Sequence, residues 1–232
     1  MRAILAMTSC DRIGDRPTGA YASELADAWK VFRDNGFQVD TVSVRGGRPP
    51  LEAIDERDPV QHAFFRDPQM RTKLAHTACP SEIEPAAILF LAGGHGAALD
   101  FPDATDLAHL IQRHHESGSV IAAVCHGPAA LLNAGTLITG KKITCFTNAE
   151  ECAVGMTRLV PYLLADELAA RGADISTGPS FLPHVITDGH LITGQNPASA
   201  TEVATRAAHL AMTPPPQNTH LPGDSSSRNT LR

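Results

Sequence analysis

Cys125 and the histidine that follows it, His126, are the residues of this chain best suited to chemistry. The segment before them, Val120–Val124, is apolar and rich in β-branched side chains, which predicts a buried strand, and a helix is expected just beyond the pair. The thiol would lie on the abrupt turn between them, which closes only with small neighbours such as Ala123 and Gly127. Because the helix aims its unpaired N–H groups at this turn, we expect Cys125 to be a thiolate nucleophile with a base beside it. A buried structural cysteine, the commonest fate of a lone thiol, is the alternative.

Strands and helices alternate along the chain, and they must position this turn. The main elements expected are strands at Arg2–Met7, Phe37–Val44 and Ile88–Ala92 and helices over about Tyr21–Asn35 and Asp103–Ser117. After the cysteine we expect a strand at Lys142–Phe146, a helix near Pro161–Arg171, short strands around Ile175, Val185 and Leu191, and a helix over about Ala198–Met212. This order predicts an α/β three-layer sandwich with a mainly parallel central sheet. Ligands of such sheets bind beyond the carboxyl ends of the strands, where Gly93-Gly94 and Cys125 both fall.

Length and composition indicate an enzyme of ordinary size rather than a nucleic-acid or membrane protein. The 232 residues fit a single α/β unit, and 43% of them are hydrophobic, enough to fill a large core. A formal net charge of −6 gives no reason to expect nucleic-acid binding. No apolar run approaches the roughly 20 residues of a membrane span, and Met1–Met7 is too short for a signal peptide. The 5 cysteines are scattered and lack metal-ligand spacing, so we expect free thiols, no metal and a cytoplasmic location.

Two segments depart from the alternating pattern. Residues 51–85 are acidic, contain prolines and are weakly helical, and we interpret them as a small cap packed near the site. From residue 213 onward the chain is rich in Pro, Asn and Ser and has few apolar residues, so 213–232 is predicted to be a disordered tail. We therefore expect one domain, residues 1–212.

Five motifs occur in an order that resembles a known family. They are Thr18–Leu25 (TGAYASEL), Gly93–Gly96 (GGHG), Ala122–Ala129 (AAVCHGPA), Thr147–Glu151 (TNAEE) and Thr193–Ser199 (TGQNPAS). Together they resemble the ThiJ/PfpI superfamily, whose flavodoxin-like fold is similar to that of class I glutamine amidotransferases. Within it the chain is most similar to the heat-shock chaperone-like branch that has glutathione-independent glyoxalase (glyoxalase III) activity. The resemblance covers about residues 1–212.

The resemblance implies a role for each site residue. The nucleophile of the branch falls on Cys125 and its histidine on His126. The acid that hydrogen-bonds the thiol from the first helix falls on Glu24. The acid that orients the histidine falls on Glu151, with Glu150 as the alternative.

The resemblance also implies a reaction and its oxyanion donors. A thiolate attacks the aldehyde carbon of methylglyoxal or glyoxal, and the amides of Gly93, Gly94 and His126 would face the alkoxide. His126 or Glu24 would then move a proton from the first carbon to the second, and hydrolysis would release a 2-hydroxy acid. The reaction requires no cofactor. The relatives imply a homodimer, and we leave protein deglycase activity open.

Other interpretations remain beside this one. A stress-response holdase would use an exposed apolar surface, and a cysteine amidase or peptidase would use the same nucleophile. An amidase must protonate an amine leaving group, whereas the isomerase must move a proton between adjacent carbons, so Glu24 beside the thiol favours the isomerase. We expect His95 to pack beside its turn and Asn196–Ser199 to cap the last helix.

Overall fold

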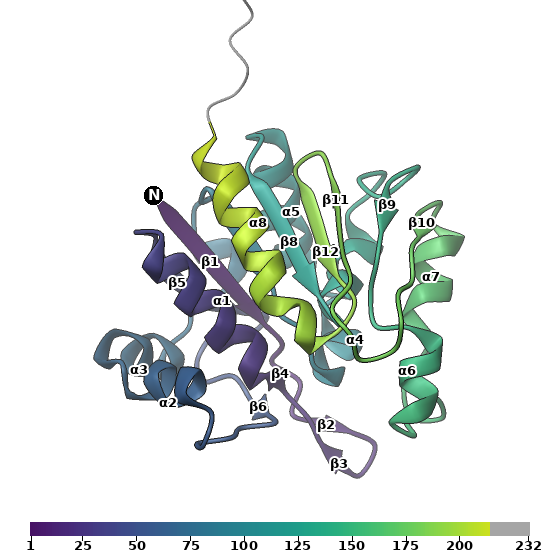
Figure 1. Ribbon diagram of the computed structural model, residues 1–232, viewed down its shortest axis with the longest axis horizontal. Helices are drawn as coiled ribbons and strands as arrows, with labels where there is room; N and C mark the ends of the chain where they lie inside the picture. The colour runs from purple at the N-terminus through teal and green to yellow at the C-terminus, as the bar shows by residue number, and fades with distance from the viewer. Residues whose placement is uncertain (214–232) are drawn as a thin grey trace, which may run out of the picture.

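The computed structural model describes residues 1–213. The predicted tail, 213–232, therefore lies outside the described residues except for Thr213. Six strands form the central sheet in the order β11-β12-β8-β7-β1-β5. They are β1 (Arg2–Met7), β5 (Gln38–Ser43), β7 (Ile88–Leu91), β8 (Val120–Val124), β11 (Val185–Asp188) and β12 (Leu191–Gly194). All neighbours are parallel except β11 and β12, so the predicted mainly parallel sheet is confirmed (Figure 1).

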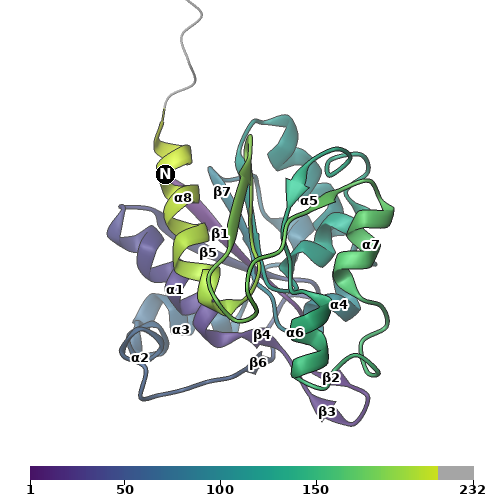
Figure 2. The ribbon, with the colours of Figure 1, turned by 45° about the vertical axis from the view of Figure 1, so that its right-hand side comes forward.

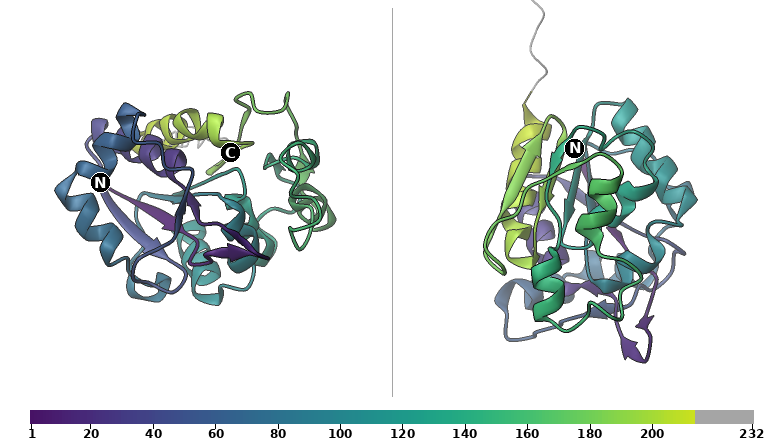
Figure 3. Two further views of the ribbon diagram at one scale, coloured as in Figure 1. Left: turned by 90° about the horizontal axis from the view of Figure 1, so that it is seen from below. Right: turned by 90° about the vertical axis from the view of Figure 1, so that its right-hand side faces the viewer.

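Helices cover both faces of the sheet and make three layers. Helices α1 (Ala22–Asp34) and α8 (Ala200–Met212) lie on one face, and α4 (His95–Asp100), α5 (Thr105–Glu116) and α7 (Leu164–Ala170) lie on the other (Figure 3). The alternation of side chains along β1 decides which layer each residue joins. Leu5 packs with α1 and α8, whereas Ile4 packs with α5. The sandwich predicted from the sequence is confirmed.

The remaining elements gather mostly at the carboxyl ends of the parallel strands. A hairpin of β2 (Arg12–Ile13) and β3 (Arg16–Pro17), the pair β4 (Ala20–Tyr21) and β6 (Leu51–Glu52), and helix α6 (Asn148–Ala153) lie together at this edge (Figure 2). The strand expected at Lys142–Phe146 is only β9 (Lys142–Ile143), which pairs with β10 (Asp174–Ile175) outside the central sheet. The 3-10 helices are η1 (Pro80–Glu82), η2 (Gly127–Asn133) and η3 (Pro197–Ser199).

The segment 51–85 follows the edge of the molecule next to β5. Its helices α2 (Pro59–Arg66) and α3 (Pro68–Ala75) pack against α1 and β5, where Phe64 joins the core beside Trp29. Its first residues reach the carboxyl edge of the sheet, where β6 pairs with β4, and Thr77 lies at the carboxyl end of β5 against Ser43. Among residues 1–213, no helix combines the length and the apolar character that crossing a membrane demands.

Candidate active site

Cys125 lies on a sharp turn at the end of β8, as the small residues around it require. Its φ is 59°, in the left-handed region that side chains rarely adopt. A Cβ on Gly127 would lie 2.1 Å from the carbonyl oxygen of Leu91, and a Cβ on Gly93 would lie 2.7 Å from the Cβ of Cys125. Both glycines are therefore needed for the turn to close against β7. The helix expected just beyond the turn is the 3-10 helix η2.

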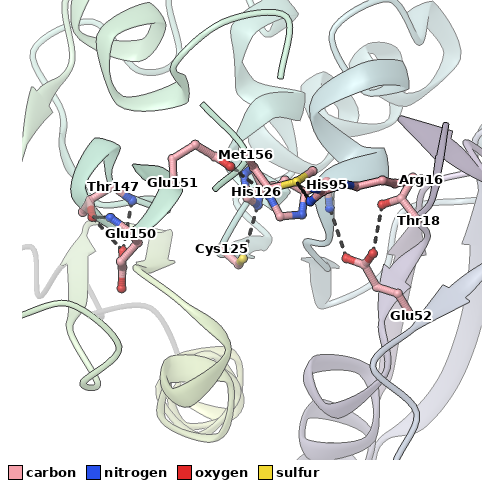
Figure 4. Close-up of polar contacts among 10 residues, drawn as sticks. All are labelled: Arg16, Thr18, Glu52, His95, Cys125, His126, Thr147, Glu150, Glu151 and Met156. Carbon is pink, nitrogen blue, oxygen red and sulfur yellow. Dashed lines mark hydrogen bonds and ion pairs between the residues drawn. The ribbon is translucent and has the colours of Figure 1, made fainter. Parts of the chain in front are cut away.

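His126 connects the thiol to a carboxylate from α6. The Cys125 Sγ lies 3.4 Å from Nδ1 of His126, and Nε2 of the same ring lies 2.8 Å from Oε2 of Glu151 (Figure 4). All three residues are buried. Helix α6 begins with a capping box in which Thr147 and Glu150 bond each other's backbone N–H, and this fixes the turn that presents Glu151. Glu151, and not Glu150, is the acid that contacts the histidine.

His95 shares the same carboxylate, a contact that the sequence did not predict. Its Nε2 lies 2.9 Å from Oε1 of Glu151, and its ring centroid lies 4.4 Å from that of His126. His95 packs against the rings of His126 and Phe146, as expected of a residue beside the turn, and it also makes this polar contact. Its place directly after Gly93-Gly94, at the edge where Cys125 also lies, was the signal that pointed to the site.

The protonation of these groups depends on burial and hydrogen bonding. Burial raises the pKa of the Glu151 carboxyl, but the bonds with His126 and His95 outweigh it and bring the pKa to about 2. Burial lowers the pKa of His126, although Glu151 opposes this. An ionised carboxylate only accepts, so a neutral His126 must donate from Nε2. Its Nδ1 then carries the lone pair that faces the Cys125 thiol.

Glu24 provides a carboxyl group beside the sulfur of Cys125. It precedes the buried stripe of Leu25, Trp29 and Phe32 on α1 and is itself fully buried. The Gly93 N–H donates to its Oε2 at 2.5 Å, whereas its Oε1 has no hydrogen-bond partner among the described residues. Burial raises the pKa of Glu24 to about 8. The proposed oxyanion role of Gly93 is therefore wrong, because its N–H is already bonded to this carboxyl.

The Cys125 thiol is itself nearly enclosed, and this bears on the expectation that it rests as a thiolate. Only 3% of the residue is exposed. The N–H groups of Gly94 and His126 bond the sulfur and lower its pKa, but burial and the Glu24 carboxyl outweigh them and raise the pKa well above its usual value. This direction favours a resting thiol over the predicted thiolate, and a thiol needs a base when it reacts. Gly94 and His126 remain as N–H donors at the reacting atom.

Glu150 has a structural role instead. Its Oε1 accepts from the Phe181 N–H at 2.8 Å and from Asn196 Nδ2 at 2.8 Å, so it ties α6 to the loop before β11. Asn196 is the N-cap residue of η3, as the sequence predicted, but its side chain makes no capping hydrogen bond and donates to the carbonyl oxygen of Leu182.

Two further residues at the site come from β4 and β6. Glu52 accepts from the Thr18 hydroxyl at 2.9 Å and from the His95 N–H at 3.2 Å (Figure 4). Its strand partner Tyr21 is partly buried and bonds the Gly93 carbonyl through its own N–H. Burial raises the pKa of the Tyr21 phenol, as do Cys125 and Glu24, so the phenol stays protonated as a donor. The short polar loop before residue 51 gave no sequence signal for this pairing.

Among the described residues, one group has ligand atoms close enough to hold a metal ion. His95, His126 and Glu151 each offer an atom within 4.8 Å of the others. The hydrogen bonds between them account for this distance. A metal would occupy ring nitrogens that here donate to the carboxylate, and would break the contact that orients His126.

Comparison with known proteins shows the family. A sequence model of the DJ-1/PfpI family matches residues 18–209, a range that includes Glu24, Cys125 and Glu151. The chain belongs to the DJ-1/PfpI family. It is 33% identical to the glutathione-independent glyoxalase HSP31 of Saccharomyces cerevisiae, over 89% of this chain and 96% of that protein.

Similar solved structures agree with the fold. The crystal structure of glyoxalase III from Candida albicans has a TM-score of 0.83 with this protein at 27% identity, covering 90% of this chain and 97% of the other. The rapid encystment protein of 24 kDa from Francisella tularensis has a TM-score of 0.87 at 31% identity, covering 92% of this chain and 100% of the other. As a member of the DJ-1/PfpI family, the chain thus has the predicted architecture over almost its whole described length.

Proposed function

We propose that this protein is a glutathione-independent glyoxalase that converts methylglyoxal or glyoxal to a 2-hydroxy acid, with Cys125 as nucleophile. The observation that carries the proposal is the buried Glu24 carboxyl beside the same sulfur that His126 faces. Two proton carriers at one thiol suit a reaction that ionises the thiol and then moves a proton between adjacent carbons. The glyoxalases among its relatives support the same conclusion.

The first step uses the lone pair of His126 Nδ1. The ring accepts the Cys125 proton as sulfur attacks the aldehyde carbon, and Glu151 stabilises the imidazolium that forms. The carbonyl oxygen becomes an alkoxide beside the N–H groups of Gly94 and His126, and then takes up a proton to give a hemithioacetal. Because these donors are backbone groups in a closed turn, they need no reorganisation when charge develops.

The second step uses Glu24. Its carboxylate removes the proton from the first carbon, and its carboxylic acid returns that proton to the second carbon. Between these two transfers, His126 takes the hydroxyl proton from the oxygen of the first carbon and delivers it to the oxygen of the second, which gives the enediol intermediate. The product is a thioester of a 2-hydroxy acid, which water cleaves to regenerate the thiol. A pKa of about 8 leaves Glu24 able to act in both forms near neutral pH. Its complete burial keeps bulk water from exchanging the proton.

The enclosure of the thiol favours this reaction over peptide hydrolysis. With Cys125 only 3% exposed, an aldehyde of a few atoms fits the approach better than an extended peptide. The glyoxalase reaction also releases no amine. Its proton moves between the two carbons next to the sulfur, which is where the Glu24 carboxyl lies.

Turnover of methylglyoxal without glutathione tests the proposal. Wild type should form lactate, Cys125→Ser should lose turnover entirely, and Cys152→Ser, which alters an exposed cysteine, should keep it. Turnover that survives Cys125→Ser would refute the assignment. If wild type and Cys125→Ser also protected an aggregating client protein equally, a holdase function would explain the result better.

The remaining expectations form part of the same proposal. All 5 cysteines lie within the described residues and are unpaired, which supports a reducing, cytoplasmic compartment. We propose a homodimer, which light scattering of the purified protein would test. We also propose one domain spanning residues 1–212, for which a single cooperative unfolding transition is expected.

A further inference from the structure

Phe181 is an exposed aromatic residue held in an unfavourable backbone conformation. It lies on the loop between β10 and β11, and 47% of it is exposed. Its φ is 61°, in the left-handed region, which is rare for a bulky residue and costs free energy unless the surroundings enforce it. Neither the exposure nor the conformation improves packing, so both call for another explanation.

Buried polar side chains enforce this conformation. Glu150 Oε1 accepts from the Phe181 N–H at 2.8 Å, and Asn196 Nδ2 donates to the carbonyl oxygen of Leu182 at 2.8 Å. Gln195 Oε1 accepts from the Gly178 N–H at 2.7 Å. Glu150, Gln195 and Asn196 are all fully buried. Buried side chains therefore fix the loop on both sides of Phe181. Their hydrogen bonds to the loop backbone replace those that water would otherwise make.

The same contacts place Phe181 at the solvent end of a row of rings that begins at the site. The His126 imidazole centroid lies 4.7 Å from that of Phe146, which lies 6.5 Å from that of Phe181. Phe146 is buried and its N–H bonds the carbonyl oxygen of Cys125. Glu150 adjoins Glu151 in the chain, so one turn of α6 fixes both the histidine and this loop. Phe181 is thus held at a fixed position relative to the site.

We propose that Phe181 determines substrate preference, by binding the apolar or aromatic group of 2-oxoaldehydes larger than methylglyoxal. This rests on the proposed glyoxalase function. An exposed ring beside a buried one offers a flat apolar wall on which a second ring can stack or pack edge to face. Phe146 separates Phe181 from His126, so we expect the methyl group of methylglyoxal to end short of Phe181 and a phenyl group to extend toward it.

Kinetics with methylglyoxal and phenylglyoxal, both without glutathione, test this inference. Phe181→Ala should lower kcat/KM for phenylglyoxal by about 2-fold to 10-fold, the effect of losing one aromatic contact, and mainly through KM. Turnover of methylglyoxal should be unchanged. Phe181→Leu should restore part of the loss, and Leu182→Ala, in the exposed neighbour, should change neither substrate. An equal loss for both substrates, or no loss for either, would overturn the inference.

Alkylation of Cys125 separates this inference from the proposed function. Iodoacetamide and N-benzyl iodoacetamide share one reactive group, and mass spectrometry of the Cys125 peptide reports the rate of each. Phe181→Ala should slow the benzyl reagent relative to the small one, whether or not the protein turns over oxoaldehydes. An unchanged ratio of rates would refute the aromatic wall, whereas a wild type without turnover of either oxoaldehyde would refute only the glyoxalase function.

Discussion

Replacing Glu24 with glutamine should weaken catalysis and, above neutral pH, strengthen the fold. Burial raises the pKa of this carboxyl from 4.5 to about 8. Below pH 4.5 the folded and unfolded chains are both protonated at this position. Between these values the unfolded chain releases the proton and the folded chain retains it, so wild-type stability falls as pH rises. Above pH 8 the two states again carry the same charge, and the cost is constant.

The size of the effect can be calculated from the shift. One pH unit corresponds to about 1.4 kcal/mol, so the free energy of unfolding of wild type loses about 4 kcal/mol between pH 5 and pH 8 through this group. Glutamine is neutral throughout. Its oxygen can still accept from the Gly93 N–H, but its NH₂ group replaces the unpartnered Oε1, at a pH-independent cost of about 1–3 kcal/mol. The variant should therefore be less stable than wild type at pH 5 and more stable at pH 8.

Urea unfolding of both proteins at pH 5, 6, 7 and 8 measures this crossover. Glu116→Gln, a change in an exposed residue of α5, is the matched control and should differ from wild type by a constant amount. Methylglyoxal turnover of Glu24→Gln should fall at least about 100-fold at every pH, as loss of acid–base catalysis requires. A stability difference that does not vary with pH would show that the buried carboxyl does not retain its proton, and the assignment of Glu24 as a buried acid would be wrong.

Three further substitutions test the rest of the site. Glu151→Gln should lower kcat by about 100-fold or more, because an NH₂ donor replaces one of the two carboxylate oxygens that accept from His126 and His95; a kcat near wild type in steady-state kinetics would contradict this. His95→Phe should lower kcat by less than Glu151→Gln does, since it removes one of the two donors to the carboxylate while His126 stays in contact with Cys125, and the ordering of the two kcat values checks it. Gly127→Ala should destabilise the fold by about 3 kcal/mol or more in urea unfolding, because its Cβ would lie 2.1 Å from a backbone oxygen of β7; a loss below about 1 kcal/mol would show that the turn can relax.

The fold could be predicted from the sequence because local patterns of apolar residues indicate its strands and helices. Apolar runs such as Val120–Val124 became buried strands, and the stripe of Leu25, Trp29 and Phe32 became the buried face of α1. Their alternation restricts the topology to few solutions. The strand expected at Lys142–Phe146 was predicted too long, because only Lys142–Ile143 pairs with another strand. A strand needs a neighbour, and the sequence does not state which neighbour is available.

Strand order and small residues were enough to predict that Gly93-Gly94 and Cys125 lie at the carboxyl edge of the sheet, and the family resemblance added Glu24 and Glu151. The contacts of His95 and Glu52 at this edge were not predicted. How those residues divide the hydrogen bonds could be learned only from their packing in three dimensions. There the Gly93 N–H bonds Glu24, Glu151 contacts two histidines, and the thiol is enclosed so that burial raises its pKa. Hydrogen-bond partners and burial depend on atoms brought together from distant segments, whereas a sequence pattern reports only the preferences of each segment.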